Sequence, residues 1–164
     1  MKILLIAPYV DLKFDQSVES SISRGDFIPS GALLYLAAIL RSNNHEPIIL
    51  DLNNTVVNNQ KDKYFDYCKK IIIDNLNKHK PDLVGINCLF SGVFGDVLEL
   101  AKAVKSHSSH FKIVIGGMHP TTFHKEILTN CNEIDYVAIG EGEKAMVALA
   151  ASIKAKNENL LSSI

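Results

Sequence analysis

The chain lacks the residue patterns of a disulfide-rich or metal-binding protein. It has three cysteines, Cys68, Cys88 and Cys131, and no two of them are close in sequence. This odd, dispersed set argues against a disulfide framework and against a closed zinc site. A zinc site built from His119, His124 and Cys131 also fits no familiar ligand spacing, so we expect no metal site.

A large net charge and long apolar runs are lacking as well. The net charge is -1, which gives no electrostatic reason to bind nucleic acid or an anionic membrane, and we expect neither partner. No apolar run reaches the ~18 residues of a membrane-spanning helix. The opening MKILLIAPYVDLKF is too short in its apolar part for a signal peptide. We therefore expect a cytoplasmic protein that begins with a buried strand.

The remaining pattern is a regular alternation of strands and helices. Hydrophobic residues make up 47% of the 164 residues and charged residues 21%, which suits one soluble domain with a core. Apolar, β-branched runs predict strands at residues 2–7, 47–52, 81–88, 112–117 and 134–140. Helical spacing predicts helices at residues 30–43, 62–79, 95–107, 122–130 and 142–157.

This alternation predicts an α/β fold with helices on both faces of a parallel sheet. The strands are apolar almost throughout, as strands buried on both faces are. Right-handed crossovers leave few topologies, and we favour a Rossmann-like (flavodoxin-like) three-layer sandwich with five parallel strands in the order 2-1-3-4-5. The helix at 30–43 is apolar nearly all round, which predicts that it is well buried.

Unusual sequence collects after the strands, at residues 8–29, 87–95, 116–121 and 140–143. In an open parallel sheet, ligands bind at the carboxyl ends of the strands near the switch point, between strands one and three in this order. The loop at 8–29 is also far longer than a usual connection. These positions favour a ligand site at that edge.

Two of these segments have ordinary structural interpretations besides a functional one. In INCLFSGVFGD (86–96), small residues leave room for a ligand near the backbone, but Ser91 or Asp96 would equally cap the next helix. In VIGGMHPTT (114–122), two glycines precede a histidine. Taken alone, that segment favours a tight turn in which Pro120 fixes the entry, Thr121 is the helix N-cap and His119 lies in solvent.

A third segment, IGEGEKA (139–145), follows the last predicted strand. Gly142 and the helix amides behind it suit a polar ligand edge, and glutamates suit a helix N-terminus. An acid-base pair of His119 and Glu141 would suit a small enzyme. However, the sequence offers no nucleophile, no GxGxxG after the first strand, and none of the acidic residues of a phosphoacceptor receiver.

Taken together, residues 30–53, 81–105, 113–128 and 134–143 resemble one family in order and spacing. They are similar to the N-terminal cobalamin-binding domain of B12-dependent radical SAM enzymes, which include methyltransferases and the anaerobic magnesium-protoporphyrin monomethyl ester cyclase. The GG-x-HPT and GEGE elements carry the resemblance. The usual Pro-Pro-Leu-Gly entry to the first helix is replaced by Ser30-Gly31.

The resemblance implies that the corrin lies over the carboxyl edge of the sheet and that the nucleotide tail enters a groove beside strands three and four. No residue of this chain is implied to be catalytic or to bind a metal. The cofactor-binding residues that it implies are Leu89, Ser91, Gly92, Gly116, Gly117, His119, Pro120, Gly140, Glu141 and Gly142.

The resemblance also leads to expectations about two features that this sequence lacks, a histidine ligand to cobalt and a radical SAM cluster motif. The loop at 8–29 has no histidine to serve as lower cobalt ligand, so we expect a displaced dimethylbenzimidazole. The three cysteines do not form the Cys-x-x-x-Cys-x-x-Cys motif of a radical SAM cluster. We therefore expect a cobalamin-binding domain at 1–156 and, at 157–164, the start of a linker to a downstream domain that binds a 4Fe-4S cluster and S-adenosylmethionine.

On this interpretation, the chain binds cobalamin and its own downstream domain and does not catalyse a reaction alone. A cofactor-free, flavodoxin-like interaction or regulatory domain is the alternative from another class.

Overall fold

The structure is a computed structural model that describes residues 1–9, 30–54 and 61–156. Most of the long loop predicted at 8–29, and the predicted linker at 157–164, lie outside the described residues. Within them, the strands are β1 (Lys2–Ala7), β2 (Glu46–Asp51), β3 (Leu83–Asn87), β4 (Lys112–Gly116) and β5 (Tyr136–Ala138). The helices are α1 (Gly31–Ser42), α2 (Lys61–His79), α3 (Phe94–His107), α4 (Met118–Asn130) and α5 (Gly142–Ala155).

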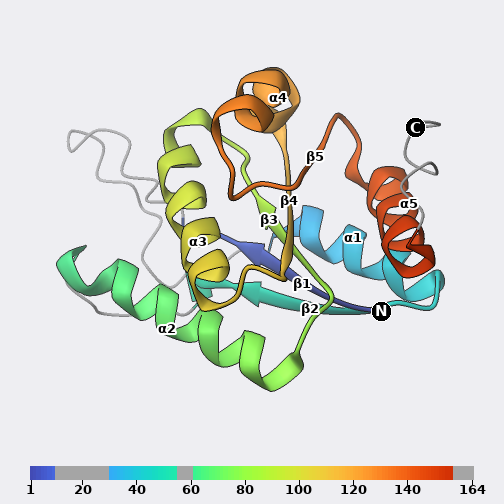
Figure 1. Ribbon diagram of the computed structural model, residues 1–164, viewed down its shortest axis with the longest axis horizontal. Helices are drawn as coiled ribbons and strands as arrows, with labels where there is room; N and C mark the ends of the chain where they lie inside the picture. The colour runs from blue at the N-terminus through green and yellow to red at the C-terminus, as the bar shows by residue number, and fades with distance from the viewer. Residues whose placement is uncertain (10–29, 55–60, 157–164) are drawn as a thin grey trace, which may run out of the picture.

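All five strands form one parallel sheet in the order β2-β1-β3-β4-β5, which confirms the predicted topology. Figure 1 shows α2 and α3 on one side of the sheet and α1 and α5 on the other. The chain order changes direction between β1 and β3, so the switch point lies where the sequence placed it.

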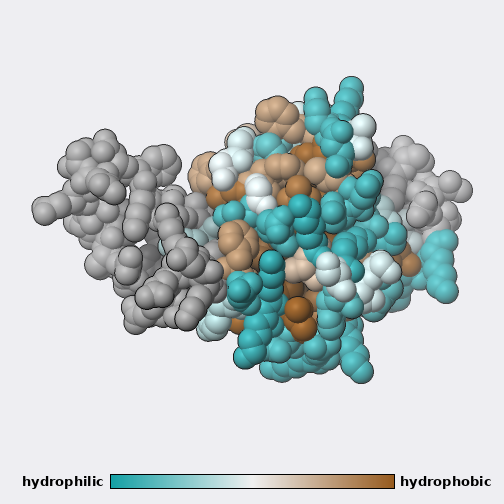
Figure 2. Space-filling view, turned by 60° about the vertical axis from the view of Figure 1, so that its left-hand side comes forward, coloured by the Kyte–Doolittle hydropathy of each residue, from teal (hydrophilic) through white to brown (hydrophobic). Residues whose placement is uncertain are grey.

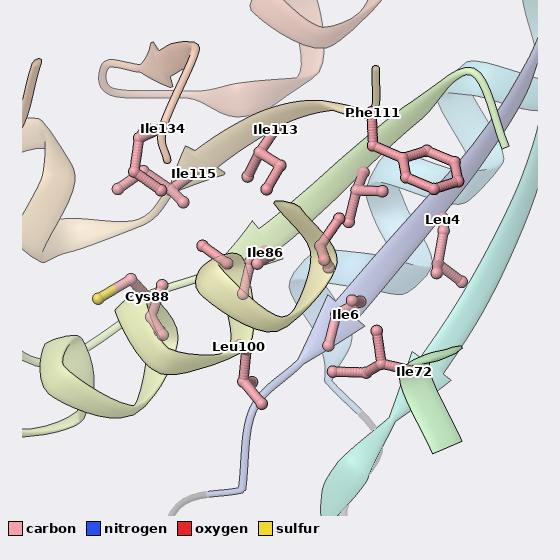
Figure 3. Packing of buried hydrophobic residues seen from close by; sticks show 14 of the residues in the cluster. Leu4, Ile6, Ile72, Ile86, Cys88, Leu100, Phe111, Ile113, Ile115 and Ile134 are labelled. Carbon is pink, nitrogen blue, oxygen red and sulfur yellow. The ribbon is translucent and has the colours of Figure 1, made fainter. Parts of the chain in front are cut away.

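Alternating side chains of β1 supply both faces of the core. Leu4 and Ile6 point toward α2 and α3, whereas Ile3 and Leu5 point toward α1 and α5. Figure 3 shows the first of these layers, in which Leu4 and Ile6 lie among Ile72, Ile86 and Leu100. A two-sided core of this kind fixes the strand register, because a slip of one residue would exchange the two faces.

The prediction that the first helix is well buried is wrong. Only Leu33, Ala37 and Leu40 of α1 are buried, while Leu34 and Tyr35 are 52% and 71% exposed. The helix rests on the sheet with one face, and no described element covers the other. An apolar composition on every side of α1 therefore did not lead to burial of every side.

The fourth helix begins four residues before the predicted start, at Met118. Its first turn contains Pro120, whose missing N–H is harmless there because the first amides of a helix have no acceptor within it. The helix is kinked at Phe123. The fifth strand is shorter than predicted, since Ile134 donates its amide to Cys131 in a turn before the strand begins.

Asp135 joins α3, β4 and β5 through one carboxylate. Lys105 Nζ lies 2.6 Å from Oδ2, Lys112 Nζ 2.9 Å from Oδ1, and the amide of Ile113 donates to Oδ2 at 2.8 Å. Burial alone would raise the pKa of Asp135, but the hydrogen bonds from both lysines and the amide outweigh it and lower the pKa. The side chain is 16% exposed, so this pairing is largely shielded from water.

No helix in the described ranges is long and apolar enough to cross a membrane.

We predict that Asp135→Ala lowers the free energy of unfolding by about 2–4 kcal/mol at pH 7, because Lys105, Lys112 and the Ile113 amide lose the carboxylate that they share. Chemical denaturation measures this. The native pKa lies below the unfolded one, so the contribution is present above pH ~4 and is lost as pH falls through the native pKa. Glu99→Ala, which removes an exposed pair with Lys102, serves as the control and should leave stability unchanged. Equal stability of Asp135→Ala and the natural chain would contradict the prediction.

Candidate functional site

A pocket opens at the carboxyl edge of the sheet, between α1 and α5. Its volume is about 180 Å³, and it is lined by residues from β1, β3, β4, the end of β5 and both helices. Its apolar walls come from Leu5, Leu33, Leu36, Val114 and Met146. The pocket therefore lies beside the switch point of the sheet, where this class of fold binds ligands.

Small residues in register create the pocket. On the face that α1 and α5 cover, Gly85 of β3 pairs with Leu5 and with Val114. One step nearer the carboxyl edge, Gly116 pairs with Asn87 on one side and Ala138 on the other. Side chains are thus missing where the neighbouring strands would otherwise fill the space beneath the helices.

Gly117 lies where the exits of β3 and β4 are in close contact. Its φ is +122°, a conformation that residues with a side chain rarely adopt. A Cβ placed on it would lie 2.5 Å from the carbonyl oxygen of Cys88. The amide of Cys88 also donates to the carbonyl of Gly116 at 2.7 Å. The second glycine is therefore required for the β3 and β4 loops to meet.

Polar groups lie at the outer end of the pocket. Asn87, at the end of β3, is half-buried, and Glu141 and Glu143 stand before and within the first turn of α5. Thr121 links this end to α4, because its Oγ1 donates to the carbonyl of Gly117 and accepts the amide of Gly140 at 3.0 Å. Thr121 lies within α4, and the helix N-cap is Gly117, so its interpretation as an N-cap is wrong.

The structure divides the predicted site residues into two groups. Five of them line the pocket: Gly116, Gly117, Gly140, Glu141 and Gly142. The other five do not line it: Leu89, Ser91, Gly92, His119 and Pro120. Leu89, Ser91 and Gly92 are exposed in the segment after β3, and Pro120 is buried in the first turn of α4.

His119 and Ser91 form the centre of a second cluster. His119 Nδ1 lies 2.9 Å from Ser91 Oγ, and its ring packs against Phe94 and Phe123 with centroid distances of 4.5 and 4.8 Å. His119 is thus packed in a helix, which corrects its interpretation as a solvated loop residue. Ser91 begins a short 3₁₀ turn (Ser91–Val93), and neither Ser91 nor Asp96 caps α3 with its side chain.

The arrangement gives no support to acid-base or metal chemistry in the described part of the chain. His119 lies in the aromatic cluster, whereas Glu141 lines the pocket. In the described ranges, no three His, Cys, Asp or Glu side chains gather in a way that could hold a metal ion. Burial raises the pKa of Cys88 to about 12, so its thiol stays protonated at neutral pH.

Large apolar side chains are exposed along the same edge of the sheet. Leu89 and Phe90 follow β3, Met118 follows β4, and Ile139 follows β5, and each is about half or more exposed. In Figure 2, tan and brown patches interrupt the hydrophilic surface in the upper half of the molecule, the half that carries α4 in Figure 1. Exposed apolar side chains that gather on one edge are typical of a surface that binds a ligand or partner.

The sequence drew attention to Asn87 and Glu143 only as members of the segments 87–95 and 140–143, and it did not single out several other pocket residues. Gly85 and Asn87 share one face of β3, and the glycine inside an otherwise apolar strand was the available signal. Ala32, Leu36, Glu143 and Met146 come from the helices, and they join the site only through the packing of α1 and α5 on the sheet.

A doubly wound parallel sheet with a pocket at its switch point defines a ligand-binding α/β domain. The B12 binding domain family matches residues 22–150. This chain belongs to that family, as its resemblance to cobalamin-binding domains predicted.

Three relatives carry names that describe enzymes. An uncharacterized methyltransferase of Pyrococcus horikoshii is 32% identical over 160 residues, which are 96% of this chain and 30% of that protein. Cytidylyl-2-hydroxyethylphosphonate methyltransferase of Streptomyces wedmorensis is 31% identical, over 66% of this chain and 22% of that protein. Anaerobic magnesium-protoporphyrin IX monomethyl ester cyclase of Rubrivivax gelatinosus is 24% identical, over 76% of this chain and 21% of that protein. The chain thus spans less than a third of the length of these relatives.

Solved structures agree on the fold. NtrX from Brucella abortus superposes with a TM-score of 0.53 at 15% identity, over 99% of this chain and 26% of that one. The N-terminal domain of a response regulator receiver protein from Methanoculleus marisnigri superposes with a TM-score of 0.50 at 12% identity, over 92% of this chain and 93% of that one. At such identities the likeness concerns the fold alone.

We predict that Gly117→Ala lowers the free energy of unfolding by about 2–4 kcal/mol, because the methyl group meets the Cys88 carbonyl and φ is strained. Gly92→Ala is the matched control, since nothing lies within 4 Å of a Cβ at that position. Denaturant unfolding of the three proteins tests this, and equal midpoints for both variants would show the prediction to be wrong.

We also predict that His119 titrates below 6.5, because burial lowers its pKa. Protonation then favours the unfolded chain, so stability falls as pH drops below the unfolded pKa of about 6.5. NMR titration of the ring protons, assigned with His119→Gln, measures the pKa. A value at or above 6.5 would contradict the expected lowering of the His119 pKa by burial.

Proposed function

We propose that this chain holds cobalamin for a longer B12-dependent radical SAM enzyme that carries out methyl transfer or ring-forming cyclase chemistry. Residues 1–156 form the cobalamin-binding domain in this proposal, and residues 157–164 begin a linker to a downstream domain with the 4Fe-4S cluster and S-adenosylmethionine. The family match and the names of the relatives support it. The relatives are more than three times as long as this chain, which leaves room for a further domain.

The pocket is the observation on which the proposal rests. Its cradle of Gly85, Gly116 and Gly117 lies on the sheet face between α1 and α5, where any added Cβ would reduce the space or meet backbone. A flat aromatic base at the end of a nucleotide tail suits a narrow pocket with apolar walls. Asn87 offers that base a hydrogen-bond partner at the outer end.

The corrin would lie outside the pocket, over the exposed apolar side chains of Leu89, Met118 and Ile139. In this arrangement His119 and Pro120 stand near the corrin edge, while Gly140, Glu141 and Gly142 flank the tail. Ser91 supports the corrin side of the site indirectly, by holding the imidazole of His119. Leu89 and Gly92 form the loop on which that side rests.

The chemistry in this proposal belongs to the cofactor, which supplies a reactive cobalt centre when bound. The share of this chain is to bind the tail, orient the macrocycle and exclude water from one of its faces. Its three cysteines are buried, so none is available to the solvent as a nucleophile or cluster ligand in the folded domain.

Binding of hydroxocobalamin tests the proposal. The purified chain is mixed with the cofactor, free cofactor is removed on a desalting column, and the visible spectrum of the protein fraction is recorded. We expect retained corrin with bands of the base-off form, since a base held in the pocket cannot coordinate cobalt.

Two variants of α1 make the test specific to the pocket. Ala32 is exposed and lines the pocket, so Ala32→Trp should reduce retention about tenfold or more without disturbing the core. Ala38 is exposed on the same helix and does not line the pocket, so Ala38→Trp should retain the cofactor. Loss of retention in neither or in both variants would contradict the proposed site. Absence of retention both in this chain and in one extended through the downstream domain would contradict the function.

A further inference from the structure

The inner part of the pocket is apolar in its side chains. Leu5, Leu33, Val114 and Met146 come from two strands and two helices, and each is at most 5% exposed. The polar side chains among the lining residues are Asn87, Glu141 and Glu143, which lie at the carboxyl edge or at the start of α5. Leu5, Gly85 and Val114 lie two positions deeper along the strands than Ala7, Asn87 and Gly116 do, or about 6–7 Å.

Gly85 marks the inner end of this apolar space. A Cβ placed on Gly85 would lie 3.1 Å from Leu5 Cδ2 and 3.7 Å from both Met146 Cε and Val114 Cγ1. Three side chains from β1, β4 and α5 therefore converge over one glycine. A methyl group added at Gly85 would therefore press on side chains that line the inner end of the pocket.

We propose that this pocket selects the base at the end of the nucleotide tail of a corrinoid, accepting apolar benzimidazoles and discriminating against purines. Gly85 and Met146 are the specificity-determining residues. This inference rests on the proposed function, because it requires that the tail enter the pocket.

The physical reason for this selection is that the two kinds of base differ in their hydrogen-bonding groups. The methyl-bearing edge of dimethylbenzimidazole has no donor or acceptor, so burial against Leu33, Val114 and Met146 leaves nothing unpaired. Adenine carries an exocyclic amino group and additional ring nitrogens. Burying those groups among apolar side chains removes them from water without a partner, which is unfavourable. Asn87 can form a hydrogen bond with one polar group of the base at the outer end of the pocket. The side chains that line the inner part are apolar, so they offer no hydrogen-bond partner to the polar groups of a purine.

Equilibrium dialysis with three corrinoids tests the selection, with visible absorbance as the readout. Cobalamin carries dimethylbenzimidazole, an adenine cobamide carries a purine, and cobinamide has no base. We expect cobalamin to bind most tightly. The adenine cobamide should bind about tenfold more weakly, which corresponds to about 1.4 kcal/mol, and cobinamide should also bind more weakly than cobalamin.

Two variants assign the selection to named residues. Gly85→Ala should weaken cobalamin binding about tenfold and bring it close to that of cobinamide, whereas Gly95→Ala, with nothing within 4 Å of the added Cβ, should have no effect. Met146→Gln keeps the length of the side chain and adds an amide to the wall. It should narrow the preference for cobalamin over the adenine cobamide by several-fold, and it remains informative if Gly85→Ala does not fold.

The outcomes separate the selection from the proposed function. Equal affinity of the natural chain for cobalamin and the adenine cobamide would overturn the selection and leave cobalamin binding intact. Cobinamide binding as tightly as cobalamin would overturn it too, by showing that the tail does not use the pocket. If no corrinoid binds to this chain or to one extended downstream, the proposed function fails and the selection fails with it.

Discussion

The close contact between Gly117 and the Cys88 carbonyl is the constraint on which the candidate site depends. It brings the exits of β3 and β4 together at the carboxyl edge of the sheet. A side chain at this position would meet backbone, which cannot move aside without separating two paired strands. The pocket on one face of the sheet and the cluster around His119 both lie against this junction, so both depend on the same glycine.

The two sides of the junction differ in character because the residues that flank it differ in size. On the face of α1 and α5, Gly85, Gly116 and Ala138 leave space. After β4, the ring of His119 fills its surroundings by packing on Phe94 and Phe123. Thr121 connects the two regions, since it joins the start of α4 to Gly140 at the end of β5. The GG-x-HPT and GEGE elements are therefore parts of one hydrogen-bonded edge.

The sequence predicted the sheet order and drew attention to the edge at which the pocket opens, because apolar runs and glycines after strands report local requirements of the backbone. It did not predict that α1 exposes Leu34 and Tyr35, since periodicity does not say which helix faces have neighbours. It grouped His119 with the pocket glycines, although the ring packs against α3, because spacing along the chain does not say to which side a side chain turns. Met146 and Leu36 could not be found at all without knowing how α5 and α1 lie on the sheet.

The division between a rigid pocket and an apolar rim has a consequence for binding. Gly85, Asn87 and Gly116 lie in paired strands, so their positions are set before any ligand arrives, and little conformational freedom remains to be lost there. Leu89, Met118 and Ile139 lie in loops or at a helix start and expose apolar surface that is unfavourable in water. Discrimination between ligands is therefore expected from the strands, where a misplaced polar group finds no partner. In the proposed arrangement, binding at the rim depends mainly on the apolar area that the macrocycle covers.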